Sequence, residues 1–220
     1  MRIDKELDNM LKKVEKPARY IGGEVNSIKK DPEKVSVRMG FAFPDTYEIG
    51  MSYMGLQILY NILNKNDDIY CERVFAPAMD MEELMRECER ELFTLETFTP
   101  VKELDILGFT LQYELSYTNV LNMLQLGNIP LRSCDRGEEH PVIIAGGPCA
   151  YNPEPLADFI DVFLIGDGEE LLEQVCLAKK DTSSKEEFLK KISAYDGVYV
   201  PSFYDVEYNE DGTVKAYNKV

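Results

Sequence analysis

The feature that most constrains this sequence is a pair of nearly unbroken apolar runs, PVIIAGG at 141–147 and DVFLIGD at 161–167. Runs of Val, Ile and Leu without alternating polar residues are typical of strands that are buried on both faces of a parallel sheet. Such strands need helices on both sides and crossover connections between neighbours. We therefore predict an α/β fold.

Three further strands are expected at 35–43, 69–77 and 105–111. Apolar residues at helical spacing follow the strands and predict helices over 50–64, 81–92, 117–124, 171–176 and 188–192. Alternation of strands and helices is typical of an open, doubly wound sheet. We predict a Rossmann-like, flavodoxin-like sheet of five parallel strands, with right-handed crossovers and the order 2-1-3-4-5.

The flanking segments divide the chain into three parts. Residues 1–32 comprise an amphipathic helix over 3–14 and an irregular connection rich in Gly and Pro. Residues 33–196 form the α/β domain. Residues 197–220 alternate with period two around the turn 209–212, which predicts a C-terminal β-hairpin extension at the periphery.

Charge and composition exclude several classes of function for this segment. With 24 basic and 40 acidic residues the net charge is -16, which repels phosphate backbones and anionic lipid, so we expect no nucleic-acid or membrane partner here. The apolar stretches are far shorter than the ~20 residues of a membrane span, and the charged amino terminus does not resemble a signal peptide. We expect the protein to be cytoplasmic.

Metal-binding patterns are missing from the sequence. The five cysteines are scattered without a CxxC pair, and there is one histidine. We therefore expect free thiols in a reducing compartment, with no structural zinc and no iron–sulfur cluster in this chain. His140 precedes Pro141 at the start of a strand and is expected in a surface loop, away from the ligand-binding edge.

Four loops follow the carboxyl ends of the predicted strands, where ligands bind in such sheets. They are 44–50, 110–112, 146–148 and 166–169. A glycine in such a loop either permits a tight turn or lets a ligand approach the backbone. Both interpretations remain open for any single loop, whereas four loops on one edge favour a site.

Phosphate binding is not expected at these loops. The sequence has neither GxGxxG nor GxxxxGK[ST], and Asp167, Glu169 and Glu170 begin a predicted helix where a pyrophosphate would otherwise bind. An NAD-type dehydrogenase is therefore disfavoured. Acidic pairs such as Asp45 with Glu48 are interpreted as capping and solvated groups, since no nucleophile lies near them.

Three stretches carry a resemblance to a known family. FPDTYEIGMSYMGLQILYNILN (43–64), PVIIAGGPCAYNPEPLADFIDVFLIGDGEE (141–170) and GVYVPSFY (197–204) resemble the amino-terminal cobalamin-binding-like domain of B12-type radical SAM proteins. The resemblance covers residues 17–204. It implies a Rossmann-like domain that binds cobalamin at the carboxyl ends of its strands. By position it implies the following cofactor-binding residues: Asp45, Tyr47 and Gly50 below the corrin, Thr110 and Gln112 beside the nucleotide tail, and Gly146, Gly147, Gly166, Gly168 and Glu169 along its path.

Three departures qualify the resemblance. The family motif DxHxxG reads Asp45-Thr-Tyr47-Glu-Ile-Gly50 here, and a phenol is a poor cobalt ligand beside an imidazole. The family's Ser-x-Leu reads Thr110-Leu111-Gln112. The CxxxCxxC motif for a [4Fe–4S] cluster is missing, so the cluster and S-adenosylmethionine are expected in a radical SAM domain outside this chain. We expect the chain to be a fragment whose partner is that domain.

We therefore expect a cofactor-binding module that is not catalytic by itself, in a radical SAM enzyme of unknown reaction. Two alternatives stay open. One is a degenerate docking module that has the same fold and no cofactor, which the replacement of the family's histidine by Tyr47 favours. The other is an unrelated α/β protein that binds a flavin.

Overall fold

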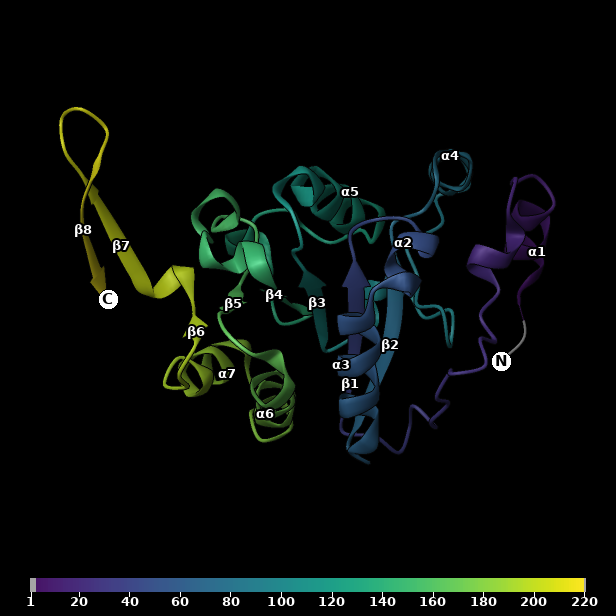
Figure 1. Ribbon diagram of the computed structural model, residues 1–220, viewed down its shortest axis with the longest axis horizontal. Coiled ribbons are helices and arrows are strands. Elements are labelled where there is room, and N and C mark those ends of the chain that lie inside the picture. Colours follow the sequence, from purple (N-terminus) through teal and green to yellow (C-terminus); the bar gives the residue numbers. More distant parts are fainter. Residues whose placement is uncertain (1–2, 220) are drawn as a thin grey trace.

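A six-stranded sheet with the order β2-β1-β3-β4-β5-β6 forms the centre of the protein (Figure 1). The computed structural model describes residues 3–219. The strands are β1 (Val37–Phe43), β2 (Ile69–Phe75), β3 (Ile106–Thr110), β4 (Val142–Gly146), β5 (Val162–Leu164) and β6 (Val198–Tyr199). The first five are parallel, which confirms the Rossmann-like class and the order 2-1-3-4-5. β6 is an additional strand, antiparallel to β5 and too short to leave a periodic pattern in the sequence.

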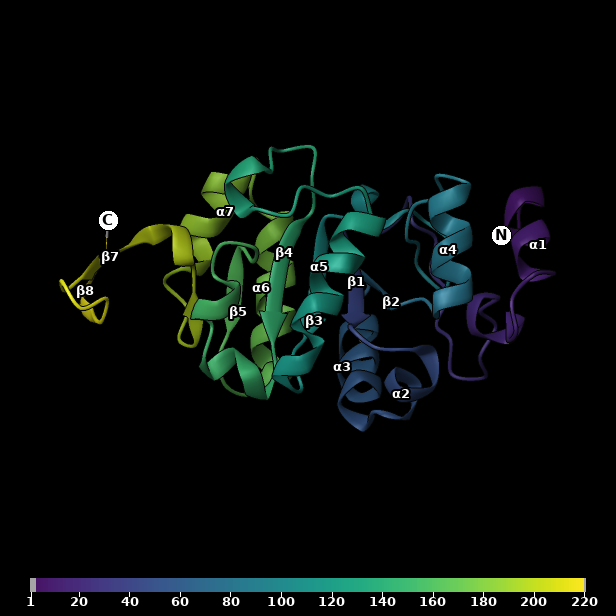
Figure 2. The ribbon, with the colours of Figure 1, turned by 90° about the horizontal axis from the view of Figure 1, so that it is seen from above.

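Helices cover both faces of the sheet (Figures 1 and 2). The buried residues of α3 (Met54–Lys65), α6 (Gly168–Lys180) and α7 (Lys185–Ile192) form one core with one face of the strands. Those of α1 (Lys5–Leu11), α4 (Met79–Glu87) and α5 (Tyr117–Leu126) form a second core on the opposite face. The sheet is therefore doubly wound, as a parallel sheet with two apolar faces requires.

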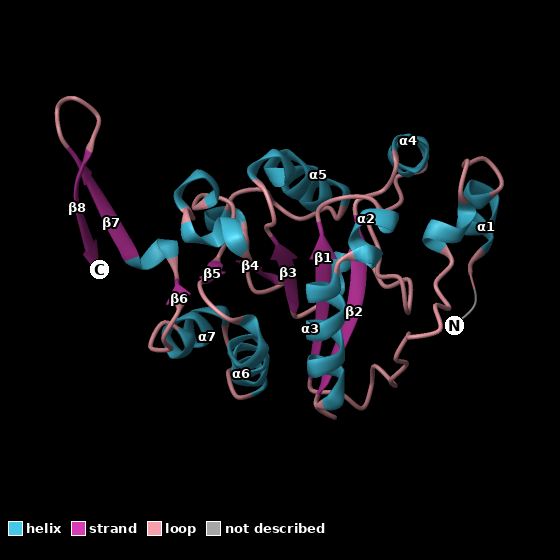
Figure 3. Cartoon of the chain, viewed as in Figure 1, coloured by secondary structure: helices cyan, strands magenta, loops and turns pink. Residues whose placement is uncertain are grey.

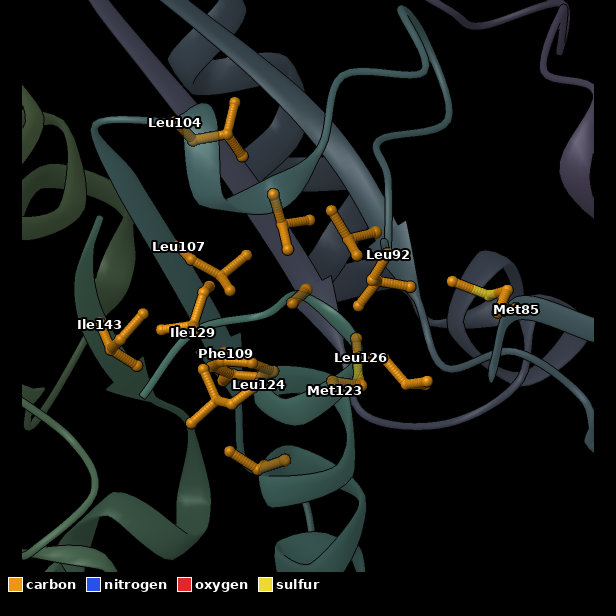
Figure 4. Packing of buried hydrophobic residues seen from close by; sticks show 14 of the residues in the cluster. Met85, Leu92, Leu104, Leu107, Phe109, Met123, Leu124, Leu126, Ile129 and Ile143 are labelled. Carbon is orange, nitrogen blue, oxygen red and sulfur yellow. The ribbon is translucent and has the colours of Figure 1, made fainter. Parts of the chain in front are cut away.

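The second core illustrates how the strands are buried (Figure 4). Leu107 and Phe109 of β3 and Ile143 of β4 pack with Met123 and Leu124 of α5, and none of these side chains is more than 2% exposed. Removal of this much apolar surface from water is the main contribution that holds helix and sheet together.

The helix predicted over 50–64 is two helices, α2 (Tyr47–Ser52) and α3, because the chain is extended at Tyr53 (φ -81°, ψ 112°) between them (Figure 3). The aromatic ring of Tyr53 lies where a side chain at Gly55 would point, since a Cβ there would come within 2.7 Å of the ring. The break directs the start of α3 towards the carboxyl edge of the sheet.

The helix predicted over 81–92 is shorter than expected. It ends at Glu87, and Glu89 follows in the left-handed region with φ 53°, which stops helical propagation. Leu92 is buried, but in an irregular segment in which Phe93 and Pro100 form an antiparallel bridge. The helical spacing of apolar residues in the sequence thus continues beyond Glu87, where the helix ends.

The hairpin expected over 203–218 is formed by β7 (Tyr204–Tyr208) and β8 (Val214–Lys219), a separate antiparallel pair. It projects from the end of the molecule beyond β6 (Figures 1 and 3), so its peripheral position is as predicted. None of the helices in residues 3–219 combines the length and apolar character needed to cross a membrane.

Edge strand β2 carries a fully buried arginine. Arg73 donates from Nε to Glu96 Oε1 at 2.7 Å and from Nη2 to Ser27 Oγ at 2.8 Å, and its guanidinium lies 4.5 Å from the centre of the Tyr60 ring. Glu24 Oε2 lies 3.3 Å from Nη2. Because a buried charge is tolerated only with such partners, Arg73 fixes residues 24–27, here called the strap, against β2 and α3.

At pH 8, where Glu96 is ionised in the folded chain, the Arg73→Met variant should lose about 3–5 kcal/mol of unfolding free energy, because the side chain of Glu96 would remain buried without its counter-charge. Urea denaturation measures this loss. The control is Arg132→Met, whose partner Asp158 is as exposed as Arg132 itself, so its removal should have little effect. Equal effects of the two substitutions would contradict the role given to Arg73.

Burial raises the pKa of Glu96 to about 7, against the opposing pull of Arg73. The folded chain therefore holds a proton that the unfolded chain releases near its ordinary pKa of 4.5. This contribution to stability is complete below that value and is lost as the pH rises through about 7.

The stability difference between the wild type and Glu96→Gln should accordingly fall between about pH 5 and about pH 8, by at most about 1.4 kcal/mol per pH unit. Urea titrations at several pH values measure it. Glu48→Gln is the control, because Arg19 lowers the pKa of Glu48 to about 2 and its contribution is lost only as the pH falls towards that value. A flat difference for Glu96→Gln would refute the assignment.

Candidate functional site

A cavity of about 200 Å³ opens at the carboxyl edge of the sheet, between the strands and helices α3 and α6. The strands contribute Gly108 and Thr110 of β3 and Ile144 and Gly146 of β4. Alternate residues of a strand face the same side, so these four positions all face α3 and α6. Two of them are glycines. A Cβ at Gly146 would make only ordinary contacts, the nearest at 3.5 Å, so this glycine leaves space in the cavity, whereas the space beside Gly108 is filled by Met39 and Ile144.

A polar pair lies in the cavity wall. Gln112 Nε2 donates to Thr110 Oγ1 at 2.5 Å. Thr110 is buried and Gln112 is half-buried, so the pair lines an otherwise apolar wall that includes Met39 and Phe41 of β1. The Thr110 hydroxyl and the Gln112 carboxamide are therefore available to form hydrogen bonds with a polar atom of a ligand in the cavity.

The loop after β4 is held against the loop after β3. Leu111 donates its amide to Gly146 O at 2.7 Å, and Cys149 donates to Leu111 O at 3.1 Å. Gly147 has φ 97°, and a Cβ there would lie 2.9 Å from Leu111 O. Glycine is therefore required at Gly147 by conformation and by close packing, whatever binds nearby.

The loop before α6 forms the opposite side of the mouth. Gly166 has φ 116°, and a Cβ on this residue would have no neighbouring atom within 4 Å, while Gly168 begins the helix beside Leu59 of α3. Asp167 and Glu169 also line the mouth. The carboxylates of this turn stabilise the positive end of the α6 dipole, as expected for acidic residues at a helix start.

Residues 44–50, which the sequence predicts as a loop, instead form a short turn over 44–46 and the first residues of α2, and they pack away from the cavity. Tyr113 donates from its hydroxyl to Asp45 Oδ2 at 2.5 Å, and Tyr47 donates to Glu24 Oε1 of the strap at 3.2 Å. The Tyr47 ring packs edge-on against Phe75 of β2. A Cβ at Gly50 would lie 2.4 Å from the same Phe75 ring. This segment is therefore packed towards β2 and the strap.

The structure thus brings together seven of the ten residues implied by the resemblance. They are Thr110, Gln112, Gly146, Gly147, Gly166, Gly168 and Glu169. Asp45, Tyr47 and Gly50 are not part of the cavity lining. They lie at the same edge of the sheet, Asp45 in the turn that follows β1 and Tyr47 and Gly50 in α2.

Protein ligands for a metal ion are not gathered at this site. Burial, with Glu24 adding to it, raises the pKa of Tyr47 above its ordinary value of 10, so the phenol is protonated at neutral pH. His140 stands just before β4, at the amino end of that strand. Within residues 3–219, His, Cys, Asp and Glu side chains form no group of three placed to hold a metal ion.

Part of the cavity wall was not anticipated from the sequence. Tyr53, Gly55, Ile58 and Leu59 of the α3 region line one side of it. Gly108 in the middle of the apolar strand was the available signal, because a glycine inside a strand often marks a close approach to the backbone.

The chain belongs to the family described as Radical SAM proteins, N-terminal, whose model matches residues 55–201. The match includes the seven cavity-lining residues that the resemblance implies, and it begins after residues 44–50. An uncharacterized protein of Methanocaldococcus jannaschii is 26% identical over 137 residues, which cover 62% of this chain and 25% of that protein. The matched segment thus spans a quarter of the relative. No solved structure matches the chain.

The three glycines at the mouth should differ in their tolerance of alanine. Gly147→Ala should cost about 1–3 kcal/mol, from strain and from the contact with Leu111 O. Gly166→Ala adds strain alone, about 1–2 kcal/mol. Gly146→Ala should change stability by less than about 0.5 kcal/mol, because its nearest new contact is an ordinary 3.5 Å to Leu164 O. Chemical denaturation ranks the three, and a costly Gly146→Ala would contradict the geometry.

Proposed function

We propose that this chain is a ligand-binding module of a radical SAM protein, and that its cavity takes the heteroaromatic base of a cobalamin. The observation that carries the proposal is the cavity at the carboxyl edge of the sheet, which Thr110 and Gln112 line and in which Gly146 of β4 leaves space. An apolar cavity of about 150 Å³ holds one benzene ring. At about 200 Å³, this one suits a small ring system and is too small for a whole cofactor.

The rest of such a cofactor would have to lie over the edge of the sheet, and the residues there support this. Met54 at the start of α3 is 69% exposed, Leu115 after β3 is 86% exposed and Tyr151 after β4 is 74% exposed. All three follow the carboxyl ends of strands. None of the three lines the cavity, but exposed apolar side chains on the same edge of the sheet are available to contact a ligand or another domain.

The residues present fit the tail of a cobalamin and provide no lower ligand for its cobalt. Thr110, Gln112 and Gly146 would hold the base. The Tyr47 hydroxyl, which stands where the family motif has histidine, is protonated and donates to Glu24. Cobalamin supplies radical chemistry to the proteins that hold it. On this proposal the chain binds and orients the cofactor and performs no reaction by itself.

The partner in this proposal is the radical SAM part of the same protein. Support comes from the family, which is defined as the N-terminal part of radical SAM proteins, and from the relative, of which the match spans one quarter. The [4Fe–4S] cluster and S-adenosylmethionine would belong to that part. Met54, Leu115 and Tyr151 would face it across the cavity mouth.

A docking module without a cofactor is the second candidate. It is favoured by the engagement of Tyr47 with Glu24 and by the small volume of the cavity. In that case the exposed apolar residues of the edge would contact the partner domain directly. A flavin is the remaining alternative, and none of the residues that line the cavity favours it over the other two.

Titration of the purified chain with hydroxocobalamin, followed by visible absorption, tests the proposal. Wild type should bind at tens of micromolar or below. Gly146→Val should weaken binding at least about tenfold, because its methyl groups enter the space for the base. Gly146→Ala should have a smaller effect, and both variants are checked for unchanged thermal unfolding. No binding by the wild type would reject the cobalamin proposal and favour the docking module.

A further inference from the structure

The hairpin formed by β7 and β8 has one apolar face. Residues that lie opposite each other in an antiparallel pair point to the same face of the ribbon. Val206 is paired with Tyr217, and Tyr208 is paired with Val214 beyond a bulge. Tyr208, Val214 and Tyr217 are 62%, 45% and 47% exposed, and Val206 is half-buried. These four residues, here called the apolar face, belong to neither core of the sheet.

The opposite face of the hairpin is polar, and the glutamate at its centre is paired within the hairpin. Glu207 accepts from Lys215 Nζ at 3.0 Å and from Asn218 Nδ2 at 2.9 Å. Asp205 lies opposite Asn218 on the same face, and both are exposed. This face is suited to water. The aromatic and branched side chains of the other face are not.

Aromatic packing fixes the base of the hairpin to the sheet. The ring of Phe163 in β5, which is fully buried, lies 6.2 Å from the ring of Tyr199, centre to centre. The Tyr199 ring lies 5.2 Å from that of Tyr204, the first residue of β7. The Tyr199 hydroxyl also donates to Glu154 Oε1 at 2.8 Å. The hairpin is therefore joined to the sheet by packing as well as by the chain.

Beyond this base the hairpin lacks the support that such an element requires. Isolated two-stranded hairpins are marginally stable in water, and a third strand or a packed apolar face is what stabilises them. β7 and β8 form a sheet of their own, and they project past β6 (Figures 1 and 3). An exposed apolar patch in such a position is typical of a surface that contacts another protein surface.

The size of the apolar face indicates which kind of partner can cover it. Its four side chains can bury on the order of a few hundred Å², well below the ~800 Å² per partner of a stable complex between separate molecules. A part of the same protein needs less area, because the linking chain holds it at a high effective concentration. A second copy of the chain is further disfavoured by the net charge of -16, which makes two copies repel each other.

The hairpin also lies directly after the unit that the family shares. The family model ends at residue 201, and β7 begins at Tyr204. In the relative from Methanocaldococcus jannaschii, three quarters of the protein lie outside the matched segment. We propose that the apolar face docks on an apolar surface of the radical SAM part of the protein. This rests on the partner named in the proposed function, and it adds an interface whose four residues do not line the cavity.

Amide hydrogen exchange followed by mass spectrometry tests the docking. The exchange of residues 204–219 is compared between the 220-residue chain and the longer protein that contains the radical SAM part. It should be at least about tenfold slower in the longer protein, because opening of the hairpin there also breaks the docking contact. Strand β4 should exchange equally slowly in both proteins, which establishes that the sheet is intact.

Two double variants identify the face that is responsible. Tyr208→Thr combined with Tyr217→Thr removes both rings and places residues that favour strands. The ratio of the exchange rates in the two proteins should then fall to within about twofold. The matched control is Asp205→Thr combined with Asn218→Thr, which alters the polar face of the same hairpin. It should keep the wild-type ratio. A ratio that the tyrosine variant keeps, or that the control loses equally, would overturn the proposal.

The remaining outcomes separate the docking from the function on which it rests. Equal exchange in the two wild-type proteins would overturn the docking. Protection of the 220-residue chain that rises with its own concentration would also overturn it, because the occupant would then be a second copy. Hydroxocobalamin titration reports on the cavity independently of the hairpin. Slowed exchange without cobalamin binding would reject the proposed ligand alone, and cobalamin binding with equal exchange would reject the docking alone.

Discussion

Burial of the central strands on both faces is the constraint on which the rest of the structure depends. β1, β3, β4 and β5 have almost no polar face, so helices must cover each side and the chain must cross over between strands. Because these strands are parallel, their carboxyl ends and the loops that follow them all lie at one edge of the sheet. The cavity lies at this edge, where Gly146 of β4 leaves space between the strands and helices α3 and α6.

The outer strand β2 differs from the other strands, because buried ion pairs stabilise it in addition to apolar packing. Arg73 joins β2 to the strap and to Glu96, while Glu72 of the same strand accepts from Arg38 and from Thr94. These contacts also determine where residues 44–50 lie, since Glu24 of the strap receives the Tyr47 hydroxyl. The buried network therefore draws these residues away from the cavity and towards β2.

The sequence could predict those features that depend on local patterns. Continuous apolar runs identified the parallel strands, and the meeting of their carboxyl ends placed Thr110, Gln112, Gly146 and Gly166 around one cavity. Contacts between segments that are far apart in the sequence could not be predicted from local patterns. The break at Tyr53 sits beside α2, where Gly50 packs on the ring of Phe75, and the burial of Arg73 depends on partners before and after it in the chain. Neither leaves a periodic signal.

The arrangement of strand edges has a consequence for association of the protein with itself. At β2 the strand is covered, because Leu95 donates to Arg73 O and Lys30 donates to Ile69 O, and β6 at the other side is only two residues long. The sheet therefore has little exposed backbone to template the addition of a strand from another molecule. The projecting hairpin does expose its edges, but its Glu207–Lys215 pair keeps charges on that surface, which opposes the growth of ordered aggregates.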